Sequence, residues 1–258
     1  FDIDLEGASQ GNVVTRFPPE PSGYLHIGHA KAALLNQYFA RQYNGKLIIR
    51  FDDTNPSKEK DEFVDNILLD CDILGLKADM VTYTSDSFQQ ILEMGTRLIK
   101  EGSMYVDDTP MDKMREERIN RIESVARTNS IETNLKLWKH MIDGDQQGLK
   151  CAARFLMDMQ NDNGALRDPV AFRCNLIPHH RTGTKYKVYP TYDCACPFVD
   201  ALEVRNSPHI NVPPLCFFSK KTNPCEHLFR LSTSRVLRTP CVHLSTETVK
   251  HSTAGYRN

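Results

Sequence analysis

The residue pattern best suited to chemistry is a pair of histidines three positions apart, His26 and His29, with Gly28 between them. A helix-like segment, residues 30–43, follows directly, so the pair is predicted to lie at a helix N-terminus. Backbone N–H groups and the helix dipole favour an anion there, and the imidazoles can donate hydrogen bonds to phosphate oxygens as charge develops. Gly28 leaves room for a flat ligand ring against the backbone. The pattern predicts a phosphate-handling site.

Charged residues stand at the ends of two predicted strands. Arg16 lies near the end of the first, residues 13–17, and Asp52 and Asp53 follow the second, residues 46–51. Ligands of open α/β sheets bind at this edge. A guanidinium fits a carboxylate and an acid can hold an ammonium group, so an amino acid is a suitable ligand. A paired-carboxylate hydrolase is the rival hypothesis. It is disfavoured because adjacent residues at a strand end point apart.

The elements that must position these residues alternate between strand and helix patterns over the first hundred residues, which predicts an α/β fold with a parallel sheet. The continuous apolar centre of residues 46–51 is typical of a strand covered on both faces. The predicted strands are residues 13–17, 46–51, 81–84 and 104–106, and the predicted helices are residues 30–41, 57–74 and 88–101.

The pattern of strand-like and helix-like segments changes after Asp108, which suggests a domain boundary there. Residues 1–108 are predicted to form the first half of a Rossmann-like domain, and residues 109–185 an inserted α+β domain. Residues 186–203 are predicted to return to the main sheet. The predicted elements of the insertion are helices over residues 111–122 and 130–144, and strands over residues 153–157, 170–177 and 185–189.

Three ordered motifs accompany the histidine pair. They read TRFPPEP at residues 15–21, RFDDTNP at residues 50–56 and YPTYD at residues 189–193. Together with the HIGH run at residues 26–29, they resemble the glutamyl/glutaminyl group of class I aminoacyl-tRNA synthetases. The resemblance covers residues 1–203 and implies the class I Rossmann-like fold, with an insertion that grips the tRNA acceptor end.

The resemblance implies ATP as a substrate, with Mg²⁺ on its phosphates. It implies that His26 and His29 are the catalytic residues that hold the triphosphate and that Gly28 lies against adenine. The loop beside the nucleotide would be shaped by Glu20, Pro21 and Ser22. Activation joins an amino-acid carboxylate to the α-phosphate, so no general base is required and alignment with charge stabilisation suffices.

The same resemblance implies that the substrate amino acid is bound by Arg16, Asp52 and Tyr192, and that Asp52 contacts its α-ammonium group. Cys194 stands where the family has an aromatic residue, which removes part of the pocket wall. Arg154 is the counterpart of an arginine that faces the tRNA end, although its local segment departs from the family's order.

The eukaryotic cytosolic glutamyl branch, including the glutamyl part of bifunctional glutamyl-prolyl enzymes, is the resemblance we favour. It implies ATP-dependent attachment of glutamate to tRNA(Glu), a cytoplasmic location and a larger multi-synthetase assembly. The alternatives are a glutaminyl-tRNA synthetase fragment, a catalytically inert fragment that binds ATP or tRNA, and a nucleotidyltransferase of related fold. The KMSKS-type loop has only a faint counterpart at residues 219–222, which favours an impaired or inert fragment.

Bulk properties narrow the class of protein further. The chain has 258 residues and a formal charge of −1, and no apolar run approaches the roughly 20 residues of a membrane helix. Eight cysteines are scattered without a C-x-x-C pair, so we predict reduced thiols and no metal site, although Cys194 and Cys196 would share one face of a strand. Residues 204–258 match nothing in the family, and we expect an irregular tail from a frameshift or mis-splicing, or a divergent one. The absence of an initial Met suggests a piece of a longer protein.

Overall fold

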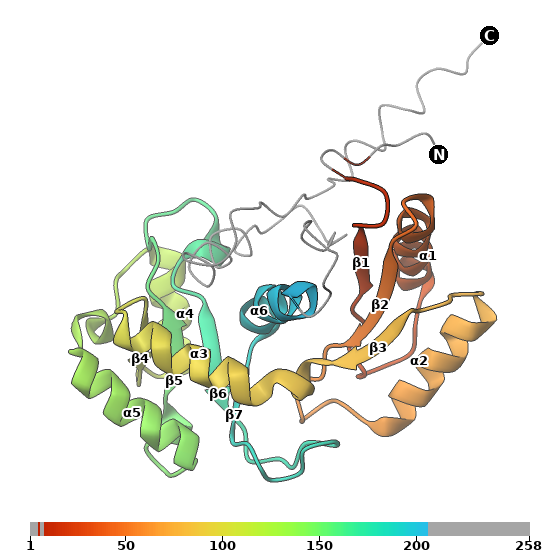
Figure 1. The fold of residues 1–258 in the computed structure, drawn as a ribbon. Helices are drawn as coiled ribbons and strands as arrows, with labels where there is room; N and C mark the ends of the chain where they lie inside the picture. The colour runs from red at the N-terminus through yellow and green to blue at the C-terminus, as the bar shows by residue number, and fades with distance from the viewer. Residues whose placement is uncertain (1–4, 6–7, 206–258) are drawn as a thin grey trace.

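A computed structural model describes Leu5 and residues 8–205 of the chain. Two sheets stand side by side, with a helix between them (Figure 1). The predicted tail is residues 204–258; its first two residues belong to the last helix, and residues 206–258 lie outside the described residues. The helices and strands, in chain order, are β1 (Val14–Phe17), α1 (Ile27–Gln42), β2 (Lys46–Phe51), α2 (Asp61–Ile73), β3 (Met80–Tyr83), η1 (Thr84–Ser87), α3 (Phe88–Lys100), β4 (Met104–Asp107), α4 (Met111–Asn120), η2 (Val125–Thr128), α5 (Ile131–Asp143), η3 (Gly148–Lys150), β5 (Ala152–Phe155), η4 (Gly164–Leu166), β6 (Val170–Cys174), β7 (Val188–Pro190) and α6 (Tyr192–Arg205).

The first sheet is parallel, in the order β1-β2-β3, as the alternating pattern predicts. Helices α1 and α2 form the crossovers and cover one face (Figure 1). Because side chains alternate along a strand, Phe17, Ile49 and Phe51 pack into the core under these helices. Their neighbours Arg16 and Arg50 belong to the opposite face. Five of the six residues of β2 are buried, which confirms the expectation of a strand covered on both faces.

The second sheet is antiparallel, in the order β4-β5-β6-β7. Its core contains Phe88, Ile91 and Leu98 of α3 together with Trp138 and Met141 of α5. The two sheets therefore divide the chain between β3 and β4, before the boundary predicted after residue 108. Helix α3 and strand β4 continue the alternation of helix and strand patterns, but α3 packs in the core of the second sheet and β4 pairs with β5.

Residues 186–203 return to the first sheet through a helix, not a strand. The strand of this segment, β7, pairs with β6 in the second sheet. Helix α6 then begins, with the amides of Cys194 and Ala195 bonded to the carbonyl of Thr191 at 3.1 and 2.9 Å. Cys194, expected on a strand together with Cys196, therefore lies on a helix and packs with Ala195 into the core of the second sheet.

The opposite face of α6 holds the first sheet through buried charges. Asp200 contacts Arg16 Nε at 2.8 Å and Arg50 Nη2 at 2.6 Å. One turn later, Glu203 accepts hydrogen bonds from Arg50 and from the hydroxyl of Thr82, the latter at 2.7 Å. Burial alone would raise the pKa of the Asp200 carboxyl, but Arg16 and Arg50 outweigh it and hold this pKa below its usual value. Thus two carboxylates on one helix face connect α6 to all three parallel strands.

None of the described helices combines the length and apolar character needed to cross a membrane.

We expect Asp200→Asn to destabilise the protein by about 3–5 kcal/mol, because it removes the carboxylate charge facing two buried guanidinium groups. Urea unfolding would measure the loss. The matched control is Asp143→Asn, whose partner Lys139 is exposed, and it should change stability by no more than about 0.5 kcal/mol. Equal effects of the two substitutions would contradict the role assigned to Asp200.

Candidate functional site

The first turn of α1 is built by the two predicted catalytic histidines. His26 is the N-cap, and its Nδ1 accepts from the amide of Gly28 at 3.1 Å. His29 Nδ1 accepts in turn from the amide of His26 at 3.2 Å. The rings stack with centroids 3.8 Å apart. Because each Nδ1 accepts, both imidazoles carry their proton on Nε2. Burial, then the nearby charge of His26, lowers the pKa of His29, which favours a neutral donor at this position.

Gly28 leaves room for the imidazole of its neighbour. A Cβ at position 28 would lie 2.9 Å from Cε1 of His26, so the exposed ring of His26 would have to shift. The imidazole therefore occupies the space beside the glycine backbone. This contact gives a reason for Gly28 within the chain itself, and its predicted contact with adenine stays a prediction.

The loop between β1 and α1 is fastened to the segment after β2. The amide of Asp52 donates to the carbonyl of Pro19 at 2.9 Å, and the amide of Lys60 donates to the carbonyl of Pro21 at 3.1 Å. Because β1 and β2 are parallel neighbours, these residues lie at the carboxyl edge of the sheet. In this loop Glu20 is exposed, Ser22 is half-buried and Pro21 is buried. The structure thus joins the predicted nucleotide loop to Asp52.

Asp52 carries an unusual carboxyl group. Its Oδ1 is buried and has no hydrogen-bond partner among the described residues. Burial, together with Asp53 and Glu20, raises its pKa to about 7, against the opposing effects of Thr54 and Arg16. A cation placed at this oxygen would offset the cost of ionisation.

Three other predicted residues lie in different surroundings. Arg16 is buried and engaged with Asp200 and Cys196 of α6, so a contact with substrate would have to share this guanidinium. Tyr192 is half-buried at the start of α6. Arg154 has no exposed side chain, since its guanidinium pairs with Asp107 at 2.6 Å and donates to a backbone carbonyl. The side chain of Arg154 is thus engaged inside the second sheet, and its predicted tRNA contact stays a prediction.

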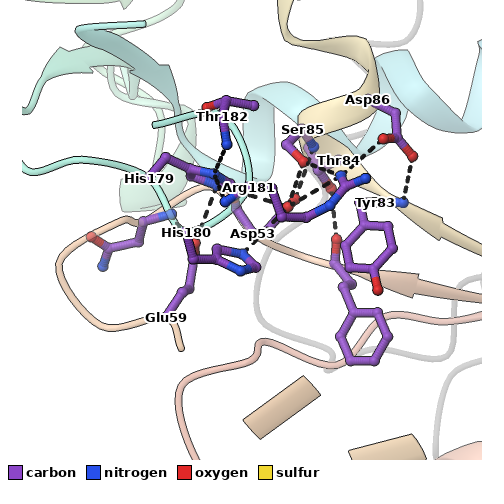
Figure 2. A network of polar contacts seen from close by, with 12 residues as sticks. Asp53, Glu59, Tyr83, Thr84, Ser85, Asp86, His179, His180, Arg181 and Thr182 are labelled. Carbon is purple, nitrogen blue, oxygen red and sulfur yellow. Dashed lines mark hydrogen bonds and ion pairs between the residues drawn. The ribbon is translucent and has the colours of Figure 1, made fainter. Parts of the chain in front are cut away.

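A polar network at the same edge was not recognised from the sequence. Asp53, which follows β2, accepts from the amide of Ser85 at 2.8 Å and from its hydroxyl. Arg181 donates to the Ser85 hydroxyl at 2.6 Å and to Asp86 at 2.8 Å. His179 Nε2 reaches the carbonyl of Asp53 at 2.8 Å. Figure 2 shows these side chains converging from the segment after β2, from η1 and from the loop before β7. The run HHRTG at residues 179–183 was the available signal, but it indicates only a turn.

Three side chains of this network are of types that can bind a metal ion. Asp53, His179 and His180 offer ligand atoms within 4.8 Å of one another. However, His179 Nδ1 accepts from two backbone amides and Nε2 carries a proton. His180 Nδ1 lies 2.6 Å from Asp61, whereas its buried Nε2 has no hydrogen-bond partner among the described residues. Both ring nitrogens of His179 are engaged, so a metal ion held by all three residues would have to break its bonds, and we assign His179 to structure.

A cavity of about 230 Å³ opens beside this network, and none of the predicted site residues lines it. Three of its charged side chains are already engaged: His180 pairs with Asp61, and Arg181 pairs with Asp86 outside the lining. The guanidinium of Arg181 also lies over the ring of Tyr83, 3.7 Å from its centre. The residues that line the cavity are Asp61, Val64, Asp65, Tyr83, His180 and Arg181.

The fold and the histidine-capped helix define a class I synthetase type of domain, and comparison with known proteins agrees. The profile described as "tRNA synthetases class I (E and Q), catalytic domain" matches residues 12–205. The chain therefore belongs to the glutamyl/glutaminyl family of class I aminoacyl-tRNA synthetases.

Its relatives include the cytoplasmic glutamate–tRNA ligase of Saccharomyces cerevisiae, 60% identical over 204 residues, and that of Arabidopsis thaliana, 58% identical over 202. These matches cover 79% and 78% of this chain but 29% and 28% of the relatives. A bifunctional glutamate/proline–tRNA ligase of Drosophila melanogaster is 58% identical over 201 residues, 78% of this chain and 12% of that protein. The chain thus spans less than a third of these relatives.

Among solved structures, a glutamate–tRNA ligase from Elizabethkingia meningosepticum shares the fold with a TM-score of 0.60 at 17% identity, over 90% of this chain and 49% of that one.

The raised pKa of Asp52 predicts a pH-dependent cost of folding. Between the usual carboxyl value of 3.8 and about 7, the folded protein keeps a proton that the unfolded chain releases, so its stability falls as pH rises through this interval. We expect Asp52→Asn to be more stable than the parent by about 4 kcal/mol at pH 8, since each pKa unit corresponds to about 1.4 kcal/mol, and equal near pH 4. Urea unfolding from pH 4 to 8 measures this difference. Asp65→Asn, on the exposed side of α2, is the control and should show no such trend; a pH-independent effect of Asp52→Asn would contradict the assignment.

Proposed function

We propose that this chain carries the ATP- and glutamate-binding half of a glutamate–tRNA ligase catalytic domain. In this proposal, glutamate is joined to the α-phosphate of ATP and then transferred to tRNA(Glu). The relatives named above, which are glutamate–tRNA ligases more than 50% identical over the matched region, support glutamate over glutamine.

One observation carries the proposal. The loop that leads to the start of α1, with its two Nε2–H donors, is bonded to Asp52 through the carbonyl of Pro19. Within the described part of the chain, the buried Oδ1 of Asp52 has no hydrogen-bond partner. The donors suit phosphate oxygens, and the carboxyl suits an α-ammonium group. Holding both partners at one sheet edge aligns a carboxylate nucleophile with a phosphoryl centre, which is the whole requirement of this reaction.

We assign roles to the chain's own residues accordingly. His26 and His29 would stabilise charge on the triphosphate, with Glu20, Pro21, Ser22 and Gly28 forming the adjacent loop. Asp52 would hold the α-ammonium group, and the cation would in turn favour its ionised form. Tyr192 and Arg16 stay proposed contacts of the amino acid, with Arg16 also neutralised by Asp200.

The cation of this reaction is Mg²⁺, which we assign to the substrate as the magnesium complex of ATP. The donors at the start of α1 are N–H groups, which fit phosphate oxygens and not a metal ion. The proposed macromolecular partner is the acceptor end of tRNA(Glu), bound by the region of the second sheet. The word cytoplasmic in the relatives' names supports a cytoplasmic location, and the bifunctional relatives support a larger synthetase assembly.

His26→Asn tests the nucleotide site while keeping the helix start. Asparagine is a good N-cap and can accept from Gly28, but it has no group equivalent to Nε2–H. We expect the dissociation constant for MgATP, measured by calorimetry, to rise about tenfold with one lost hydrogen bond. The melting temperature should stay within about 2 °C.

His140→Asn on α5 is the matched control and should bind MgATP like the parent. Glutamate-dependent exchange of pyrophosphate into ATP by the parent chain would support catalysis, and exchange with glutamine instead would indicate the glutaminyl branch. Binding of MgATP without exchange would indicate an inert fragment. Unchanged binding by His26→Asn would contradict the assigned site.

A further inference from the structure

The region of the second sheet reaches the proposed amino-acid site through one imidazole. We propose that His179 is a positioning residue that fixes the backbone beside Asp52, and so sets the geometry of the α-ammonium site. This inference rests on the proposed function for its substrate, but its structural part concerns Asp52 alone.

The bonds of His179 define its protonation and its orientation. A carbonyl oxygen only accepts, so the 2.8 Å contact with the carbonyl of Asp53 requires a proton on Nε2. The amides of Arg181 and Thr182 point at Nδ1 at 3.1 and 3.2 Å, which requires a lone pair there. The ring is therefore neutral with one tautomer. Burial, only partly opposed by Asp53, lowers its pKa and favours the same form.

The imidazole is anchored firmly on the side of the second sheet. Its ring packs edge-on against Phe88 with centroids 5.5 Å apart, and parallel to Tyr189 at 6.0 Å. Both aromatic residues belong to the core of the second sheet. The loop also closes on itself, because the backbones of His179 and Gly183 exchange bonds of 2.9 and 2.8 Å. The donor at Nε2 is thus presented from a rigid frame (Figure 2).

The residue that receives this bond is adjacent to Asp52. The amide of Asp52 is held by Pro19, and the carbonyl of Asp53 is held by His179. The carboxylate of Asp53 is fixed separately by Ser85. Asp52 is consequently held by backbone bonds on both sides, while its own Oδ1 stays unpartnered among the described residues. Loss of the His179 bond would release one of the two sides.

Two amide substitutions separate the functions of the two ring nitrogens. In His179→Gln the side-chain NH₂ can reach the position of Nε2 and donate to Asp53. In His179→Asn the shorter side chain can replace Nδ1 but cannot reach Asp53. Both variants are neutral and both lose the aromatic packing. The pair therefore tests the bond to Asp53 and not the general cost of replacing a buried ring.

The measurements are calorimetric binding of glutamate and of MgATP to the full chain, and the ¹³C NMR titration of the Asp52 carboxyl. We expect His179→Asn to weaken glutamate binding about tenfold, as the loss of one fixed hydrogen bond predicts, and to shift the Asp52 titration. His179→Gln should keep both close to the parent, and MgATP affinity should change little in either. His140→Asn again serves as the surface control.

Each alternative outcome has a defined meaning. Parent-like glutamate binding and Asp52 titration in His179→Asn would overturn the inference. Parallel losses of glutamate affinity, MgATP affinity and stability in both variants would also overturn it, because they indicate a structural role only. If the parent binds no glutamate, the proposed substrate is wrong, and the positioning role is tested by the Asp52 titration alone. A shifted Asp52 titration in His179→Asn but not in His179→Gln supports this role. Equal Asp52 titrations in the two variants refute it.

Discussion

The structure depends on the burial of one carboxylate, Asp200, between two guanidinium groups that project from neighbouring parallel strands. Two arginines on one face of a sheet would be strongly destabilising without a compensating anion. Helix α6 supplies it, and the helix can do so only because its other face, with Cys194 and Ala195, is already packed on the second sheet. The ion cluster therefore fixes the distance and orientation between the two sheets, and with them the edge at which substrates would meet.

A second connection joins the sheets at the carboxyl edge and differs in kind. The bond from His179 to the carbonyl of Asp53 involves neutral groups, whereas the α6 connection depends on full charges. Protonation of a carboxylate or screening by salt would weaken the ion pairs of α6 but would leave the neutral hydrogen bond of His179 largely intact. The ionic connection secures the sheet's face, and the neutral connection refines the local backbone beside Asp52, where an additional charge would disturb a carboxyl that already ionises with difficulty.

Much of the first sheet could be predicted from sequence because it obeys local rules. The boundaries of β2 agree residue for residue, and β1, β3 and α1 agree within a few positions. The order of motifs led to the correct family. Prediction failed where a segment's partner is distant in sequence. The local sequence of β4 does not indicate that it pairs with β5. The short segment around Cys194 is compatible with either a strand or a helix. Its helical form depends on contacts of Asp200 and Glu203 with Arg16 and Arg50, which lie 184 and 153 positions earlier.

The candidate site shows the same division between residue type and environment. Sequence alone placed His26, His29 and Asp52 at strand and helix ends, where chemistry is expected. It could not show that Arg154 is buried, because the local sequence does not distinguish a buried arginine from one that binds RNA. The distinction depends on a partner distant in sequence, here Asp107. Nor could it assign the proton of His26 and His29 to Nε2, because that follows from which amides point at Nδ1. Position follows from pattern, but the readiness of a group to donate, accept or ionise follows from the contacts that tertiary structure creates.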